Sequence, residues 1–233
     1  MATFAGPGML EASSRFWERT MSQTSLPPAI DPDYLALLDS DRISGRTRQI
    51  MEERAQTSDA DYKPRHLSPE AHNVLVALTS RVLPQGAVLS DASINLAARI
   101  DARLGTAGDG WRFASLPPDR EAYELALTGL DTQARQNTGK GFDALAPGDQ
   151  DSMIHTMAEG GLATEKLDAT QMRAWFADLR ADCVQIFISH PAVQAQLGID
   201  AIFNGGDGFF QGFSAMGEGV EESWEPAAKG IRP

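Results

Sequence analysis

Apolar residues recur at intervals of three and four through the middle of the chain, as they do along the buried face of an α-helix. Alternation of apolar and polar residues with a period of two, which would indicate β-strands, is nearly absent. The longest apolar stripe consists of Met172, Phe176, Leu179, Cys183, Ile186 and Phe187. The pattern therefore predicts an all-α fold.

Residues 67–197 are predicted to form a single helical domain of about five main helices. Their starts are marked by capping side chains, which accept a backbone N–H, and by prolines, which fit the first helical position. The predicted starts are Ser68-Pro69, Ser90-Asp91, Pro117-Pro118, Ala146-Pro147 and Leu167-Asp168. One side of the second helix is predicted to carry Ile94, Ala97, Asp101 and Leu104, and the fifth helix is predicted to run until His190-Pro191.

Two long irregular arms flank this domain. Residues 1–66 hold small clumps of apolar residues between turns, with a few helical turns predicted, for instance at residues 33–40 and 44–55. Residues 198–233 hold eight glycines, and each glycine disfavours a helix by about 1 kcal/mol relative to alanine. The same segment holds five aromatic residues, Phe203, Phe209, Phe210, Phe213 and Trp224, which is not typical of a solvated disordered tail. We therefore expect the arms to lie on the helical domain or on another protein. The side chains expected to contact a partner are Phe16, Trp17, Tyr34, Phe203, Phe209, Phe210, Phe213 and Trp224.

The charge of the chain excludes some classes of partner. There are 32 acidic and 20 basic residues, which gives a formal net charge of −12. A surface that binds nucleic acid needs clustered Lys and Arg, and the sequence has no such cluster, so we expect no nucleic-acid partner. An anionic membrane surface would repel the chain, and no apolar run approaches the roughly 20 residues that a membrane-spanning helix needs. We therefore expect no direct membrane insertion.

Residue types that carry chemistry are present but scattered. The four histidines show no pair at the i, i+4 spacing of a zinc-binding helix. Asp151 and His155 are interpreted as a surface pair, Cys183 as a buried apolar residue, and residues 205–208 (GGDG) as a turn rather than a phosphate cradle. His190 is expected to cap the end of the long helix, where the helix dipole favours a charged imidazolium. We therefore expect no catalytic, cofactor-binding or metal-binding residue in this chain.

Four sequence blocks, taken in order and with their spacing, resemble a known family. They are residues 75–84 (LVALTSRVLP), residues 123–134 (YELALTGLDTQA), residues 141–145 (GFDAL) with Gln150, and residues 175–191, which contain WFADL and FISHP. Together they resemble subunit 3, the small or gamma subunit, of the gluconate 2-dehydrogenase family. The resemblance covers roughly residues 68–215 and leaves out most of both arms.

The resemblance implies a small subunit that carries no flavin and binds a large catalytic flavoprotein of the glucose–methanol–choline type. In that family the large subunit binds FAD and oxidises a sugar, sugar acid, glycoside or polyol. A cytochrome c subunit, which carries heme c, often takes the electrons onward. The small subunit is thought to support folding, stability and commonly export of the catalytic subunit. We therefore expect a non-catalytic subunit of a hetero-oligomeric oxidoreductase.

This sequence departs from the family in one respect. It has no adjacent Arg-Arg pair and no secretion signal, whereas family members commonly carry a twin-arginine signal. If Met1 is the natural start, we expect a cytoplasmic complex. The alternative is a periplasmic complex in which the partner carries the export signal.

Two other functions remain open at the level of sequence. The first is a free-standing helical adaptor or chaperone-like interaction protein with no redox role. The second is an enzyme whose site combines residues that are distant in the sequence, such as an acidic cluster and His155.

Overall fold

A computed structural model describes residues 27–56, 62–106, 114–203, 205–208, 214–215 and 217–225. All regular structure in these residues is helical, which confirms the predicted all-α fold. In chain order the elements are α2 (Pro32–Leu38), α3 (Gly45–Ala55), α4 (Pro69–Val82), α5 (Gly86–Leu89), α6 (Leu96–Arg103), α7 (Asp119–Thr138), η1 (Phe142–Ala144), α8 (Pro147–Ala158), α9 (Ala169–Ile188) and α10 (Pro191–Leu197).

Capping side chains account for several of these helix starts. The Ser68 hydroxyl accepts a hydrogen bond from the backbone N–H of Ala71 at the start of α4. At the start of α9, Asp168 and Gln171 form a reciprocal capping box, in which each side chain bonds the other's backbone N–H. Four of the five starts predicted for the main helices are confirmed, as are the two short helices of the first arm.

The predicted start of the second main helix at Ser90-Asp91 is wrong, because α6 begins at Leu96 with Asn95 as its cap. A short helix, α5, ends at Leu89. Its C-cap residue, Ser90, has a φ of 54°, which lies in the left-handed region. The amide of Gln85 then bonds both the backbone N–H and the carbonyl of Ile94, each at 2.9 Å. These two bonds take the backbone groups that a helix across this segment would need for itself.

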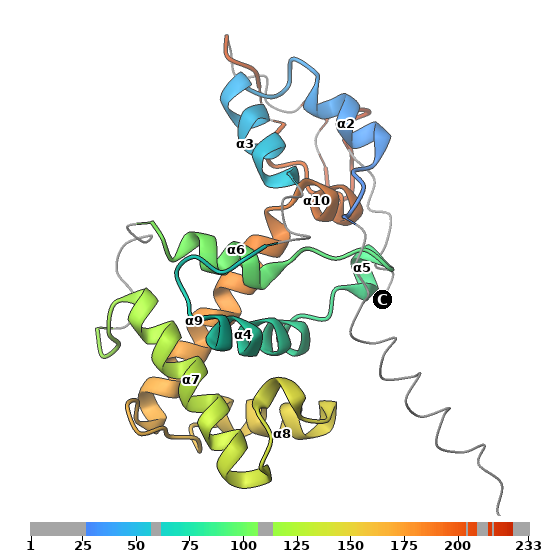
Figure 1. The fold of residues 1–233 in the computed structure, drawn as a ribbon. Coiled ribbons are helices and arrows are strands. Elements are labelled where there is room, and N and C mark those ends of the chain that lie inside the picture. Colours follow the sequence, from blue (N-terminus) through green and yellow to red (C-terminus); the bar gives the residue numbers. More distant parts are fainter. Residues whose placement is uncertain are drawn as a thin grey trace, which may run out of the picture.

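The main core lies among α4, α6, α7, α8 and α9. Figure 1 shows that α9 runs the length of this group and joins it to α10. The stripe predicted for α9 is buried, apart from a half-buried Ile186, and α7 buries Tyr123, Leu127, Leu130 and Ala134. In the centre, the rings of Tyr123 and Trp175 meet edge to face with their centroids 5.5 Å apart.

A second, smaller core joins the two arms and was not predicted. Its buried residues come from the first arm, from α10 and from the second arm: Tyr34, Leu38, Ile43, Met51, Ala195 and Phe203. Figure 1 shows α2 and α3 packed around α10 at one end of the molecule. Helix α10 was not predicted, because His190-Pro191 was interpreted only as the end of the preceding helix, whereas Pro191 is also the first residue of a new one. The apolar clumps of each arm are too small to bury themselves, but together they pack against one side of α10.

Replacing Phe203 by Ala tests this second core. The ring is 0% exposed and packs against Tyr34, so Phe203→Ala should destabilise the local structure by about 3–5 kcal/mol through lost burial and the cavity left behind. Limited proteolysis should then cut within α3 much faster than in the wild type, while α4 to α9 stay resistant. Val220→Ala, at a side chain that is 53% exposed, is the control. Equal cleavage of all three proteins would contradict this description of the core.

Candidate interaction site at the junction of the arms

We define the arm junction as α2, α3 and α10 together with Phe203 and residues 205–208. Polar contacts hold the two arms in place, both within this junction and against the helical body (α4 to α9), and they join residues that are distant in the sequence.

Asp101 of α6 forms the first anchor. Its side chain is 0% exposed, yet its carboxylate accepts four hydrogen bonds from the segment that leads into α4. Oδ2 accepts from the Tyr62 hydroxyl at 2.5 Å and from the backbone N–H of Arg65 at 2.8 Å. Oδ1 accepts from the backbone N–H groups of His66 and Leu67, at 3.2 and 2.7 Å. Burial alone would raise the pKa of Asp101, but these hydrogen bonds outweigh it and hold the pKa below its usual value.

Arg99, two residues earlier on α6, forms the second anchor. Its guanidinium donates to the carbonyl oxygens of Arg54 and Gln56, at 2.9 and 3.0 Å, and so bonds the C-terminal end of α3. A cation at that end is favoured by the helix dipole as well as by the hydrogen bonds. One helix of the body therefore holds the first arm on both sides of residues 57–61.

The third anchor is the hydroxyl of Tyr34 in α2. It donates to Oε1 of Gln194 in α10 at 2.9 Å and lies 3.1 Å from the carbonyl oxygen of Ile199. Burial, together with the nearby carboxylate of Asp200, raises the pKa of Tyr34, so the hydroxyl keeps its proton and remains a donor. The Tyr34 and Phe203 rings meet edge to face with their centroids 5.2 Å apart.

The second arm returns to the loop before α3. Oδ2 of Asp207 accepts from the backbone N–H of Gly45 at 2.9 Å, and the backbone N–H of Gly205 donates to the carbonyl of Arg42 at 2.9 Å. A carboxylate at a helix N-terminus satisfies a free N–H and complements the dipole. The predicted turn at residues 205–208 is therefore found as a bend that caps α3.

Of the eight side chains predicted to contact a partner, the structure describes three. Tyr34 and Phe203 are 1% and 0% exposed and pack against each other. Both close the core that the two arms share, and contact with a partner stays a prediction for the set. Trp224 is half-buried, and the guanidinium of Arg42 lies 4.1 Å from the centre of its ring. The other five lie outside the described residues: Phe16, Trp17, Phe209, Phe210 and Phe213.

Comparison with known proteins decides the family. The sequence model of gluconate 2-dehydrogenase subunit 3 matches residues 69–206, more than half of the chain. The chain belongs to the gluconate 2-dehydrogenase subunit 3 family. Neither a curated protein nor a solved structure matched it.

The extent of the family match follows the architecture. It begins at the first residue of α4 and ends at Gly206, so it includes the body, α10 and Phe203 but neither α2 nor α3. In this member of the gluconate 2-dehydrogenase subunit 3 family, the matched part thus holds half of the arm junction, and the first arm supplies the rest. The four sequence blocks that carry the resemblance lie on α4, α7, η1 with α8, and α9.

A second buried network joins three helices of the body. Arg103 of α6 bonds Asp182 of α9 at 2.7 Å and Asp119 of α7 at 2.8 Å, and the Tyr123 hydroxyl also donates to Asp182 at 2.5 Å. Burial, and then the charge of Asp182, raise the pKa of Tyr123 well above its usual value. This network was not predicted, because its members are far apart in the sequence.

The remaining candidate residues have structural positions. Burial raises the pKa of Cys183 to about 12, which confirms its reading as a buried apolar residue. His190 is a cap, as predicted, but it caps the start of α10 through Nδ1, which accepts from the backbone N–H of Ala192 at 3.2 Å. Burial lowers the pKa of His190 to about 4, so the prediction of a charged imidazolium is wrong and the ring is neutral near pH 7. Asp151 pairs with Arg81 of α4, whose Nε lies 2.8 Å from Oδ1.

Two absences hold for the described parts of the chain. No three His, Cys, Asp or Glu side chains of these residues are grouped as metal ligands. Among the same residues, no helix combines the length and the apolar character needed to cross a membrane.

The Asp101 anchor predicts a loss of stability that depends on pH. In Asp101→Asn one acceptor oxygen becomes an NH₂ group that faces N–H or O–H donors, so the variant should lose about 2–3 kcal/mol of unfolding free energy at pH 7. Because the pKa of Asp101 is lower in the folded state, this contribution is complete above the carboxyl's unfolded pKa. It is lost as the pH falls through the folded value. Chemical denaturation at several pH values measures it, with the exposed Asp91→Asn as control. A deficit equal to that of Asp91→Asn at pH 7 would refute the anchor.

Gly206 predicts a steric effect on the second arm. A Cβ at this position would lie 2.5 Å from the carbonyl oxygen of Asp41, and a backbone atom has little room to move. Gly206→Ala should therefore displace residues 205–208 and speed amide exchange at Gly45, whose N–H bonds Asp207. Gly208→Ala is a matched control, since a Cβ there would meet nothing within 4 Å. Similar exchange at Gly45 in both variants would contradict this packing.

Proposed function

We propose that this chain is the non-catalytic small subunit of a dehydrogenase complex whose catalytic subunit binds FAD and is of the glucose–methanol–choline type. The observation that carries the proposal is the match to a family of dehydrogenase subunits over the whole helical body. Its substrate class is a sugar, glycoside, sugar acid or polyol, oxidised on the partner. Where a third subunit is present, it carries heme c and takes the electrons onward.

The contacts of the charged groups inside this chain favour a structural role for them over a chemical one. Asp101 bonds the segment before α4, and Asp182 bonds Arg103 and Tyr123. Glu124 likewise bonds the hydroxyl and the backbone N–H of Ser68, at 2.6 and 3.0 Å. Each carboxylate joins elements that are distant in sequence. Such a preformed body is suited to stabilise a larger partner, because little conformational entropy is lost on binding.

The complex itself provides the test. The tagged chain, expressed together with a neighbouring open reading frame for an FAD protein, should purify with that protein at a fixed ratio and with flavin absorbance. The flavoprotein expressed alone should give less soluble, FAD-loaded enzyme and lower dehydrogenase activity with an artificial electron acceptor. A flavoprotein that folds, binds FAD and resists heat equally well without this chain would refute the proposal.

The arm junction also favours a second candidate, a free-standing helical adaptor with no redox role. The two arms bury a shared core within a single chain, so the fold does not depend on a partner for that part. An adaptor would be monodisperse alone and would capture no flavoprotein. The same co-purification therefore separates the two candidates.

A further inference from the structure

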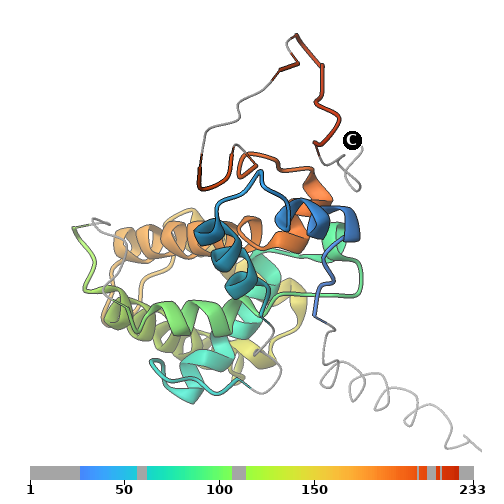
Figure 2. The same ribbon diagram turned by 90° about the horizontal axis from the view of Figure 1, so that it is seen from above.

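The outward side of α9 carries a second apolar stripe, in addition to the side that faces the core. The stripe consists of Ala174, Ala177, Ala181, Val184 and Ile188. We name these five residues the outer seam. Val184 and Ile188 are 44% and 41% exposed, Ala177 and Ala181 are exposed, and Ala174 is half-buried. In Figure 2, α9, drawn in orange, runs along one side of the body.

The spacing of the outer seam is that of a helix–helix contact. Its members follow one another at intervals of three, four, three and four, which is the repeat that places side chains along the line between two packed helices. A surface helix ordinarily has polar residues on its outer side. The alanines at one end also allow a second helix to approach closely. A continuous, straight stripe of this kind is suited to a second helix that lies along it.

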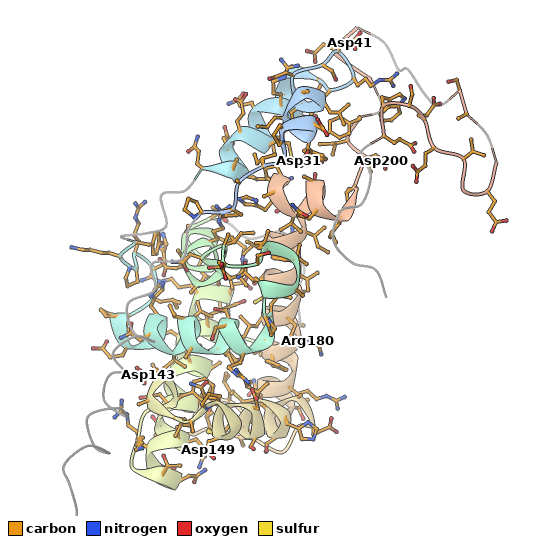
Figure 3. The ribbon with its side chains drawn as sticks, turned by 90° about the vertical axis from the view of Figure 1, so that its right-hand side faces the viewer. Asp31, Asp41, Asp143, Asp149, Arg180 and Asp200 are labelled. Carbon is orange, nitrogen blue, oxygen red and sulfur yellow. The ribbon has the colours of Figure 1, made fainter. Side chains whose placement is uncertain are left out.

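Charges border the seam asymmetrically. Arg173 and Arg180 are both exposed and lie one heptad apart on one edge, while Asp178 and Gln185 lie on the other. Figure 3 shows Arg180 at the outer margin of the body, with its guanidinium 6.0 Å from the Phe176 ring on the same helix. Two arginines beside an apolar stripe stand out in a chain of net charge −12. They complement a partner helix that carries carboxylates beside its apolar face.

The area of the seam argues against a second copy of this chain as the occupant. Five small side chains supply a few hundred Å² at most, whereas a stable interface buries roughly 1,200–2,000 Å² in total. Antiparallel copies would also bring Arg173 of one chain towards Arg180 of the other. A large partner that contacts further surface can use the seam as one part of its interface.

We infer that the outer seam binds an amphipathic helix of the catalytic flavoprotein, with Asp or Glu side chains of that helix against Arg173 and Arg180. This inference rests on the proposed function and adds to it the surface and the chemistry of the contact.

Substitutions in the middle of the seam test the inference in the co-expressed complex. Ala181→Glu places a carboxylate between Ala177 and Val184 and should weaken binding of the flavoprotein at least tenfold, about 1.4 kcal/mol. Ala102→Glu is the matched control, because Ala102 is exposed on α6 and the change in charge is the same. The melting temperatures of the two isolated variants should agree with the wild type, which shows that both are folded.

The bordering charges have their own test. Arg180→Glu should weaken binding several-fold, with a larger effect at low salt than at high salt, whereas Lys140→Glu at another exposed site should not. A photo-crosslinking residue at position 184 should join this chain to a segment of the flavoprotein with helical apolar spacing and flanking Asp or Glu.

The outcomes separate the two proposals. If the wild type captures the flavoprotein and Ala181→Glu binds it as tightly as Ala102→Glu does, the seam is refuted and the proposed function stands. If the wild type captures no flavoprotein, the proposed function fails and this inference fails with it. If the isolated chain is a dimer that Ala181→Glu dissociates, the occupant is a second copy and the inference is overturned.

Discussion

The buried carboxylate of Asp101 is the interaction on which the arrangement of this chain depends. A charged group that is fully removed from water is unfavourable unless hydrogen bonds replace its hydration, and here four donors from one segment do so. The same helix presents Arg99 to the end of α3 and Arg103 to α7 and α9. Thus α6, only eight residues long, positions the first arm and ties the body together.

The composition of the two arms indicates irregular segments with no core of their own, but the arms share a core with each other and with α10. Neither arm has a periodic stripe long enough to bury a core, yet together they pack against α10 and bury Tyr34 and Phe203. The surface that a partner can contact therefore lies elsewhere, on the outer side of α9 and around the exposed arm segments. A subunit built in this way presents a preformed surface, so its binding to a large partner loses less entropy than the folding of two free arms would.

Local features were predictable from the sequence, and tertiary ones were not. The caps Ser68 and Asp168 act within one turn, so their sequence context predicts the helix starts. The start of α6 was mispredicted because the amide of Gln85 bonds Ile94 from nine residues away. Asp101 was interpreted from the sequence as one member of an apolar stripe. Most of its donors are backbone N–H groups, which no sequence pattern indicates. The burial of Tyr34 and Phe203 against each other was not predicted for the same reason, because their contacts span most of the chain.

Hydrogen exchange on the isolated chain, read by mass spectrometry, tests the central claim most directly. If α6 holds the arms and body as one structure, peptides from α2, α3 and α10 should be protected in the absence of any partner. Their amide exchange should be slowed to a similar extent as that of residues 62–68. Peptides from α2 and α3 that exchange at the rate of an unfolded chain, while α4 to α9 remain protected, would contradict the account.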